Sequence, residues 1–165
     1  MILLFILSGC STAPTQQVEA GKTLVIGRVI YTGEQIDEIY TIDMNIKAKQ
    51  QIDMIVDPPG SLGNKLRTGP GGLFYYLADT NQTFTITELK LHKETDRAWR
   101  SISQQANIKG KTAADGVTNF GTIYWHISGE HGSQTRQTDQ VKEIEAFFKL
   151  KYPDSPWSTE TWHIK

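Results

Sequence analysis

Two histidines and a glutamate lie close together in the chain, and their side chains are common zinc ligands. His126 and His131 are five residues apart, and Glu130 lies between them. Two imidazoles and one carboxylate leave an open position for water, as catalytic zinc sites do. Residues five apart on a strand point to opposite faces, so only a turn at Gly129–Gly132 brings the rings together. The pattern favours a solvated turn without a metal or other cofactor, with a metal-dependent hydrolase as the alternative.

Other groups with catalytic potential each lack a required feature. Gly21-Lys22-Thr23 and Gly110-Lys111-Thr112 resemble the end of a phosphate-binding loop, but a glutamine replaces the earlier glycine in both. Gly60-Ser61-Leu62-Gly63 lacks the residue that separates glycine from serine in a nucleophile elbow. Asp53 and Asp57 form a carboxylate pair, but glycosidases need their two carboxylates about 5–10 Å apart, which a sequence does not specify. We therefore predict that the protein is not an enzyme.

Aromatic side chains are the stronger binding candidates. Tyr75-Tyr76 and Tyr124-Trp125 are adjacent pairs in expected strands, so one ring of each pair points away from the core. An outward ring can contact a protein partner or stack on a sugar. The other interpretation is that the C-terminal helix covers these rings. The candidate binding residues are Tyr75, Tyr76, Tyr124, Trp125, Trp157 and Trp162.

The single cysteine of the chain, Cys10, follows an apolar segment at the N-terminus. Residues 1–7 are all apolar, but as a helix they span only about 10 Å of the roughly 30 Å bilayer core. This length predicts a secretory signal. Leu7-Ser8-Gly9-Cys10 resembles the lipobox of bacterial lipoproteins. The resemblance implies cleavage before Cys10, a diacylglycerol thioether on its sulfur and acylation of its new amine, which together anchor a protein stably.

The chain is predicted to have three parts. Residues 1–9 form a signal peptide whose true start lies upstream, residues 10–20 form the lipidated cysteine with a flexible tether, and residues 21–165 form one domain. A length of 165 residues with 38% hydrophobic and 21% charged residues is typical of a globular domain. The net charge of −1 without a basic block disfavours nucleic acid as a partner.

Alternating and β-branched segments predict a mainly β domain. We expect strands over residues 24–31, 42–48, 52–56, 73–77, 84–91 and 120–127, and a short terminal strand within 158–165. Residues 98–108 fit either a strand or a short helix. Residues 57–72 hold three prolines and five glycines and are predicted to form a long loop.

One segment near the C-terminus predicts a helix. Val141, Ile144, Phe148 and Tyr152 form an apolar stripe at helical spacing. Asp139 is the expected N-cap, and Pro153 is expected to end the helix. Together with the strands, this pattern predicts an antiparallel β-sandwich or small barrel with one C-terminal α-helix.

Three segments are similar to the transthyretin-like, carboxypeptidase-regulatory β-sandwich. They are Ile26-Gly27-Arg28-Val29, residues 68–77 and Phe84-Thr85-Ile86. Residues 116–123 resemble a segment of many small envelope lipoproteins. Phe84 replaces the usual tyrosine, and the loop between strands is longer than in that pattern. The resemblance implies a binding or structural module and carries over no catalytic residues.

These features predict a cell-envelope lipoprotein, anchored through Cys10, that acts as a non-catalytic binding or assembly module for a protein or glycan. The alternative is an envelope-polymer hydrolase that uses His126, His131 and Glu130. A third interpretation is a purely structural subunit of an envelope assembly. Ser11 differs from the aspartate that retains many lipoproteins in the inner membrane, so the resemblance implies the outer membrane where the cell has one.

Overall fold

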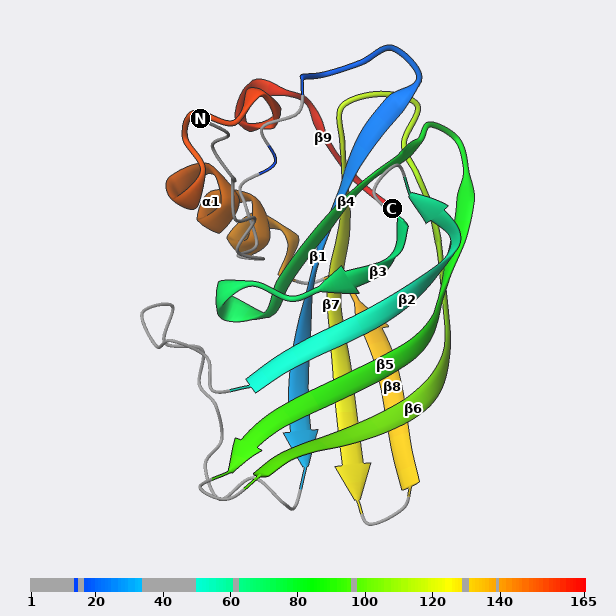
Figure 1. Cartoon of the computed structure of the whole chain (residues 1–165). Helices are drawn as coiled ribbons and strands as arrows, with labels where there is room; N and C mark the ends of the chain where they lie inside the picture. Colours follow the sequence, from blue (N-terminus) through cyan, green and yellow to red (C-terminus); the bar gives the residue numbers. More distant parts are fainter. Residues whose placement is uncertain are drawn as a thin grey trace, which may run out of the picture.

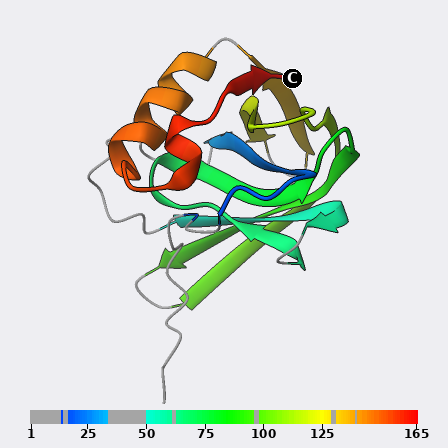
Figure 2. The same cartoon turned by 90° about the horizontal axis from the view of Figure 1, so that it is seen from above.

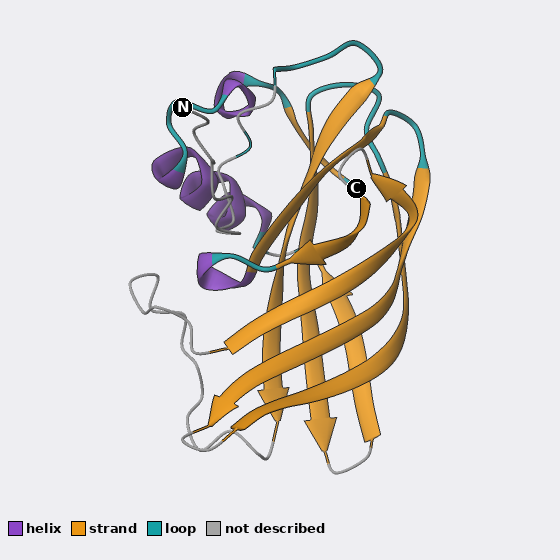
Figure 3. Ribbon diagram, in the orientation of Figure 1, coloured by secondary structure: helices purple, strands orange, loops and turns teal. Residues whose placement is uncertain are grey.

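The protein has two β-sheets and one α-helix arranged as three layers (Figures 1 and 2). The structure is a computed structural model and describes residues 14, 17–33, 50–60, 63–95, 98–128, 131–138 and 140–165. A five-stranded sheet lies in the middle, with the helix on one face and a four-stranded sheet on the other (Figure 3). The mainly β, sandwich-like architecture with a helix near the C-terminus confirms the predicted fold class at this level.

The five-stranded sheet is mixed. Its strands are β4 (Leu73–Asp79), β1 (Lys22–Gly33), β7 (Val117–Ser128) and β8 (His131–Gln137) in that order, with β9 (Trp162–Ile164) also on β7. The β1–β7 and β7–β9 pairs are parallel, and the other pairs are antiparallel. The predicted antiparallel pairing therefore holds for only part of this sheet, since β7 pairs in parallel with both β1 and β9.

The four-stranded sheet is antiparallel throughout. Its order is β3 (Gly63–Arg67), β2 (Gln50–Gly60), β5 (Thr83–Thr95) and β6 (Ala98–Lys111). The segment 98–108, for which a strand and a helix were both possible, lies in β6. The loop predicted over residues 57–72 is wrong in part, since β2 extends to Gly60 and β3 pairs Leu66 with Met54. The strand expected at 42–48 lies outside the described residues.

Two apolar clusters join the layers. The cluster between the sheets includes Val25, Met54, Phe74, Phe120 and Trp125, all with essentially no exposure. The second cluster lies between the five-stranded sheet and the helix layer, and its side chains are Leu24, Ile26, Leu73, Leu77, Val117, Ile144, Phe148 and Trp157. The five-stranded sheet is thus apolar on both faces where α1 and η2 cover it, as expected of a middle layer, whereas His126 near the end of β7 is exposed.

The helix layer consists of α1 (Val141–Lys151) and the short 3-10 helix η2 (Pro156–Thr159). Val141, Ile144 and Phe148 are buried, which confirms the predicted stripe. Gln140 is the N-cap residue of α1 and makes no side-chain cap bond. Asp139, which was predicted as the N-cap, lies outside the described residues. A second 3-10 helix, η1 (Pro70–Gly72), precedes β4.

A bulge in β7 fixes the start of the helix. The β1–β7 register shifts between Ile26 and Gly27, opposite Asn119 and Gly121. The Asn119 side chain donates a 2.7 Å hydrogen bond to the carbonyl of Val141 and accepts one of 3.1 Å from the Gly121 amide. Gly121 has a φ of +81°, and a Cβ there would lie 2.2 Å from a backbone oxygen of Gln137. Glycine is therefore required where the first turn of α1 docks on the sheet.

Candidate functional site

A buried carboxylate lies on the outward face of the four-stranded sheet. Ile52, Met54 and Val56 point into the core, so Asp53 points away from it. Even so, the Asp53 side chain is only 2% exposed. Burying a carboxylate costs several kcal/mol unless charged or hydrogen-bonding partners surround it. The side chains that cover Asp53 are therefore the feature that needs explanation.

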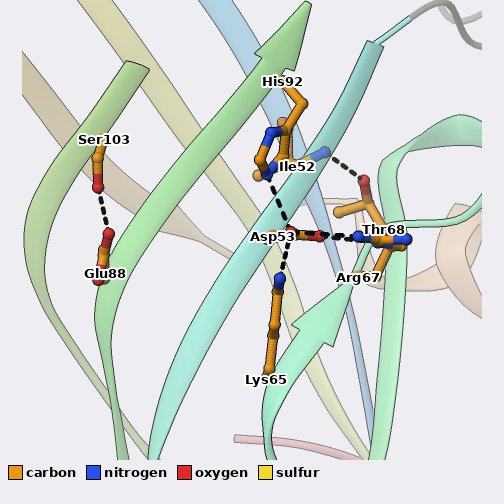
Figure 4. Close-up of polar contacts among 8 residues, drawn as sticks. All are labelled: Ile52, Asp53, Lys65, Arg67, Thr68, Glu88, His92 and Ser103. Carbon is orange, nitrogen blue, oxygen red and sulfur yellow. Dashed lines mark hydrogen bonds and ion pairs between the residues drawn. The ribbon is translucent and has the colours of Figure 1, made fainter. Parts of the chain in front are cut away.

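Three cationic or ionisable side chains converge on Asp53 (Figure 4). Lys65 Nζ lies 3.0 Å from Oδ2, and Arg67 Nε donates a 2.9 Å hydrogen bond to Oδ1. His92 Nε2 lies 3.0 Å from Oδ2. Lys65 and Arg67 come from the edge strand β3, whereas His92 comes from β5 on the other side of β2. We call Asp53, Lys65, Arg67 and His92 the Asp53 cluster.

The cluster keeps its carboxylate ionised. Burial raises the pKa of Asp53, but hydrogen bonds from Arg67 and Lys65 and the charges of both residues outweigh it, so the pKa lies below its ordinary value of 3.8. The Asp53 hydrogen bond raises the pKa of Arg67 in turn. The cluster therefore remains an ion-pair network across the neutral pH range.

The surface around Asp53 carries excess positive charge. The β2–β5 register places Lys90 directly opposite Asp53, and Lys90 shares the outward face. Lys65, Arg67 and Lys90 together outnumber the single carboxylate at the centre of the cluster. The nearest acidic neighbour in this register is Glu88, which accepts a hydrogen bond from Ser103 (Figure 4). Such a surface attracts an anionic group from solution.

The other half of the predicted carboxylate pair does not join this site. Asp57 lies four residues further along β2 and is exposed. Four residues of strand span about 13 Å, beyond the roughly 5–10 Å that a glycosidase pair requires. Asp53 is recognisable in the sequence as a charged residue inside a strand of alternating apolar residues. Its cationic partners were missed because β3 was predicted to be loop.

Three of the predicted binding aromatics lie largely inside the domain. Tyr76 and Trp125 point into the core between the sheets, and Trp157 is fully buried under the helix layer. The Tyr76 hydroxyl has no hydrogen-bond partner among the described residues, and burial raises the pKa of Tyr76. Their buried rings stabilise the layers.

The remaining aromatics pack near the helix or stay partly exposed. Tyr75 makes an edge-on contact with Tyr152, with ring centroids 6.2 Å apart. The ring centroids of Trp162 and Phe148 lie 5.5 Å apart. Tyr124 is partly exposed on the face of β7 opposite Trp125. The six rings are therefore distributed over both faces of the five-stranded sheet.

The histidine motif and the lipidation motif are described only in part. His126 is exposed, and its Nδ1 lies 3.2 Å from the Thr32 hydroxyl. Glu130, the His131 side chain and Cys10 lie outside the described residues. Within the described ranges, no group of three histidine, cysteine or acidic side chains is arranged to hold a metal ion.

A cleft separates α1 from the edge of the five-stranded sheet. It measures about 410 Å³, and its lining is Arg28, Gly71, Leu73, Glu143, Ile144, Ala146, Phe147 and Leu150. Arg28 Nε donates to the carbonyl of Gly71 at 3.1 Å, and its Nη1 lies 3.4 Å from the Gln140 side-chain oxygen. Burial lowers the pKa of Arg28, partly offset by Tyr124 and Glu143. The cleft is mainly apolar, with one guanidinium at its wall.

Comparisons with known proteins found no relative of this chain. No protein family, curated protein or solved structure matches the chain. Among the helices of the described residues, none has the length and apolar character needed to cross a bilayer.

Proposed function

We propose that this protein is a lipid-anchored protein of the bacterial cell envelope that binds an acidic protein or glycan through the Asp53 cluster. The single observation that carries the binding proposal is the buried Asp53 carboxylate, which holds Lys65 and Arg67 in place on an outward sheet surface. A carboxylate that preorients cationic side chains lowers the entropy that binding costs. The negative charge of an acidic partner complements the positive charge of this surface, where the cations outnumber the carboxylates.

The anchor rests on the lipobox resemblance of Leu7-Ser8-Gly9-Cys10 and on the apolar residues before it. We infer a location at the outer membrane in cells that have one. Intact-mass analysis of the native protein should show a chain that begins at Cys10 and carries acyl groups. Cys10→Ala should leave the chain unprocessed and release much of it from the membrane fraction. An unmodified Cys10 in the native protein would refute the anchor.

We also propose that the domain is a variant of the transthyretin-like sandwich. The residues that carry the resemblance fall in corresponding kinds of structure, since Ile26–Val29 lies in β1 and Phe84–Ile86 lies in β5. Residues 73–77 form most of β4. The family resemblance supports a binding module. The ion pairs of the Asp53 cluster on the outward face of the four-stranded sheet agree with that role.

Salt dependence tests the binding proposal. Acylated protein is immobilised and exposed to envelope extract from its own cells at low and at high salt. The Debye length falls from about 10 Å at 0.1 M salt to about 3 Å at 1 M, so a partner bound through charge should elute over that range. A partner that stays bound at 1 M salt would indicate apolar recognition and would contradict the proposed site.

A further inference from the structure

The sheet side of the cleft beside α1 is built from three elements. Arg28 in β1 and Leu73 at the start of β4 are direct partners in the sheet, and both line the cleft. Gly71 of η1 lines it next to them, and Figure 3 shows η1 on the same side of the sheet as α1. The neighbouring Gly72 lies so close to β1 that a Cβ there would be 2.2 Å from the carbonyl oxygen of Val29. These elements therefore pack directly on one another and define one surface of the cleft.

The helix side of the cleft is apolar over nearly two turns of α1. Ile144, Phe147 and Leu150 follow one another along it at intervals of three residues. Ile144 is buried, whereas Leu150 is 78% exposed. Residues 144 and 150 are six positions apart, which is about 9 Å along the helix axis. The apolar surface is therefore elongated along the helix.

The cleft is larger than a single side chain. Its volume of about 410 Å³ lies within the roughly 300–1,000 Å³ that is typical of small-molecule pockets. A cavity of about 150 Å³ lined by leucine, isoleucine and phenylalanine holds one benzene ring, so one aromatic side chain of a partner protein would fill about a third of this cleft. An elongated apolar molecule matches both the volume and the shape of the apolar surface.

The half-buried Arg28 guanidinium has hydrogen-bond donors that the protein does not use. Its Nε donates to the Gly71 carbonyl at 3.1 Å, and its Nη1 lies 3.4 Å from the side-chain oxygen of Gln140. A guanidinium carries five N–H donors, so these two contacts fix its orientation and leave further donors for a ligand. Among the residues that the structure describes, no acidic side chain forms an ion pair with Arg28. A ligand oxygen can therefore complete the hydrogen bonding of this group.

Net charge does not select the ligand of this cleft. Glu143 is exposed and also lines the cleft, so the two charged side chains of the lining, Arg28 and Glu143, have opposite signs. Affinity must then come from the apolar surface, where each buried methylene group strengthens binding about fourfold. Arg28 contributes the orientation of the ligand, because its donors lie at one place on an otherwise apolar lining.

We propose that the cleft binds an acyl chain, with a carboxylate or ester oxygen at the head of the chain accepting hydrogen bonds from Arg28. Fatty acids and the acyl groups of lipids share this chemistry. The site lies on the helix side of the five-stranded sheet and includes neither the Asp53 cluster nor Cys10. Its test is therefore independent of the proposed partner and of the proposed anchor.

Calorimetric titration with fatty acids tests the proposal. The full chain carrying Cys10→Ala is purified without detergent, so that neither detergent nor an acyl group on Cys10 competes for the cleft. We expect dodecanoate to bind with one-to-one stoichiometry and at least about tenfold more tightly than octanoate, because its longer chain extends the apolar contact. A dissociation constant above about 1 mM for dodecanoate, or equal affinities for the two acids, would overturn the proposal.

A second acyl compound distinguishes the two sources of the chain. Dodecanoylglycerol carries the same chain as dodecanoate with an uncharged ester at its head. Binding of both compounds assigns the cleft to the acyl groups of lipids, and binding of dodecanoate alone assigns it to free fatty acids. Either result supports an acyl-chain site.

A cationic compound with the same chain tests the role of Arg28. Dodecyltrimethylammonium has no acceptor oxygen and should bind at least about tenfold more weakly than dodecanoate. Arg28→Met removes the donors and should abolish this preference. A preference of the same size in wild type and in Arg28→Met would overturn the assigned orientation of the ligand.

A substitution that fills the cleft tests where the chain binds. Ala146 is exposed and lines the cleft, so Ala146→Trp adds a large ring there while the buried face of α1 stays unchanged. We expect the affinity for dodecanoate to fall at least about tenfold. Lys142→Trp is the matched control, because Lys142 is exposed on the same helix but outside the lining, and it should bind dodecanoate as wild type does. Both variants should unfold at the urea concentration of wild type, and equal affinities in the two would overturn the assignment of the site.

Discussion

The two sheets of this protein use their second faces in opposite ways. The five-stranded sheet buries one face against the four-stranded sheet and, where α1 packs on it, the other face as well, with Val25 and Leu24 as adjacent examples. The four-stranded sheet buries one face and presents ion pairs on the other, with Met54 and Asp53 as adjacent examples. The first sheet therefore serves stability, while the second leaves a face for recognition.

The difference is visible in the composition of the strands. β4 contains the continuous apolar run Leu73-Phe74-Tyr75-Tyr76-Leu77, as expected of a strand covered on both sides. β6 alternates Ile102, Ala106 and Ile108 with polar residues, as expected of a strand with one solvated face. In these two strands, the continuous apolar run belongs to the strand that is covered on both faces and the alternating pattern to the strand with one solvated face.

Removal of an apolar contact from the covered face should have the largest effect. Phe148→Ala deletes a ring with 0% exposure that packs between α1 and the sheet, and we expect a loss of about 3–5 kcal/mol in unfolding free energy. Urea denaturation measures it. Leu150→Ala in the same helix is the control and should change stability by less than about 0.5 kcal/mol. Equal costs for the two variants would show that α1 does not cover the sheet.

Loss of the buried charge on the open face should have an intermediate effect. Asp53→Asn replaces a carboxylate with an amide that presents donors to Lys65 and Arg67. We expect a loss of about 1–3 kcal/mol in unfolding free energy, because the charge-assisted hydrogen bonds to Asp53 disappear. The loss stays moderate because the two released cations recover hydration. Asp57→Asn in the same strand is exposed and should be nearly neutral. An Asp53→Asn variant with unchanged unfolding free energy would mean that the cluster does not hold its cations in place.

Acid pH should reveal the same carboxylate through a smaller, graded effect. The folded-state pKa of Asp53 lies below 3.8, so its ion pairs contribute fully above that pH and are lost as the pH falls through the folded-state pKa. The difference in unfolding free energy between wild type and Asp53→Asn should be constant at about pH 5–7 and shrink from about pH 4 toward pH 2. A difference that is independent of pH would exclude an ionised Asp53 as its source.

Local sequence patterns predicted most elements of the fold but not their partners. The runs in β1, β4 and β7 and the stripe of α1 have clear periodicity, and the structure confirms them. The parallel pairing of β1 with β7 joins residues about a hundred positions apart, and no local pattern encodes it. β3 was missed because glycines and prolines surround its single buried residue, Leu66.

The candidate site was predictable only in part for the same reason. Asp53 stands out in the sequence, but its ion-pair partners Lys65, Arg67 and His92 become its neighbours only through the β3-β2-β5 order. Adjacent aromatics were predicted to face opposite sides of their strands, and Tyr75 and Tyr76 do so. The interpretation that the C-terminal helix covers such rings holds for Tyr75, which contacts Tyr152 at the end of α1, whereas Tyr124 stays partly exposed.

The most direct test of the account compares two pairs of lysines on the same open face. Lys65 and Lys90 adjoin Asp53, whereas Lys109 and Lys111 lie on β6, the opposite edge strand of that sheet. Full-length acylated protein carrying Lys65→Glu and Lys90→Glu should retain envelope partners at least about tenfold less than wild type. The matched Lys109→Glu and Lys111→Glu protein should retain them as wild type does. Equal retention by the two double variants would contradict recognition through the Asp53 cluster.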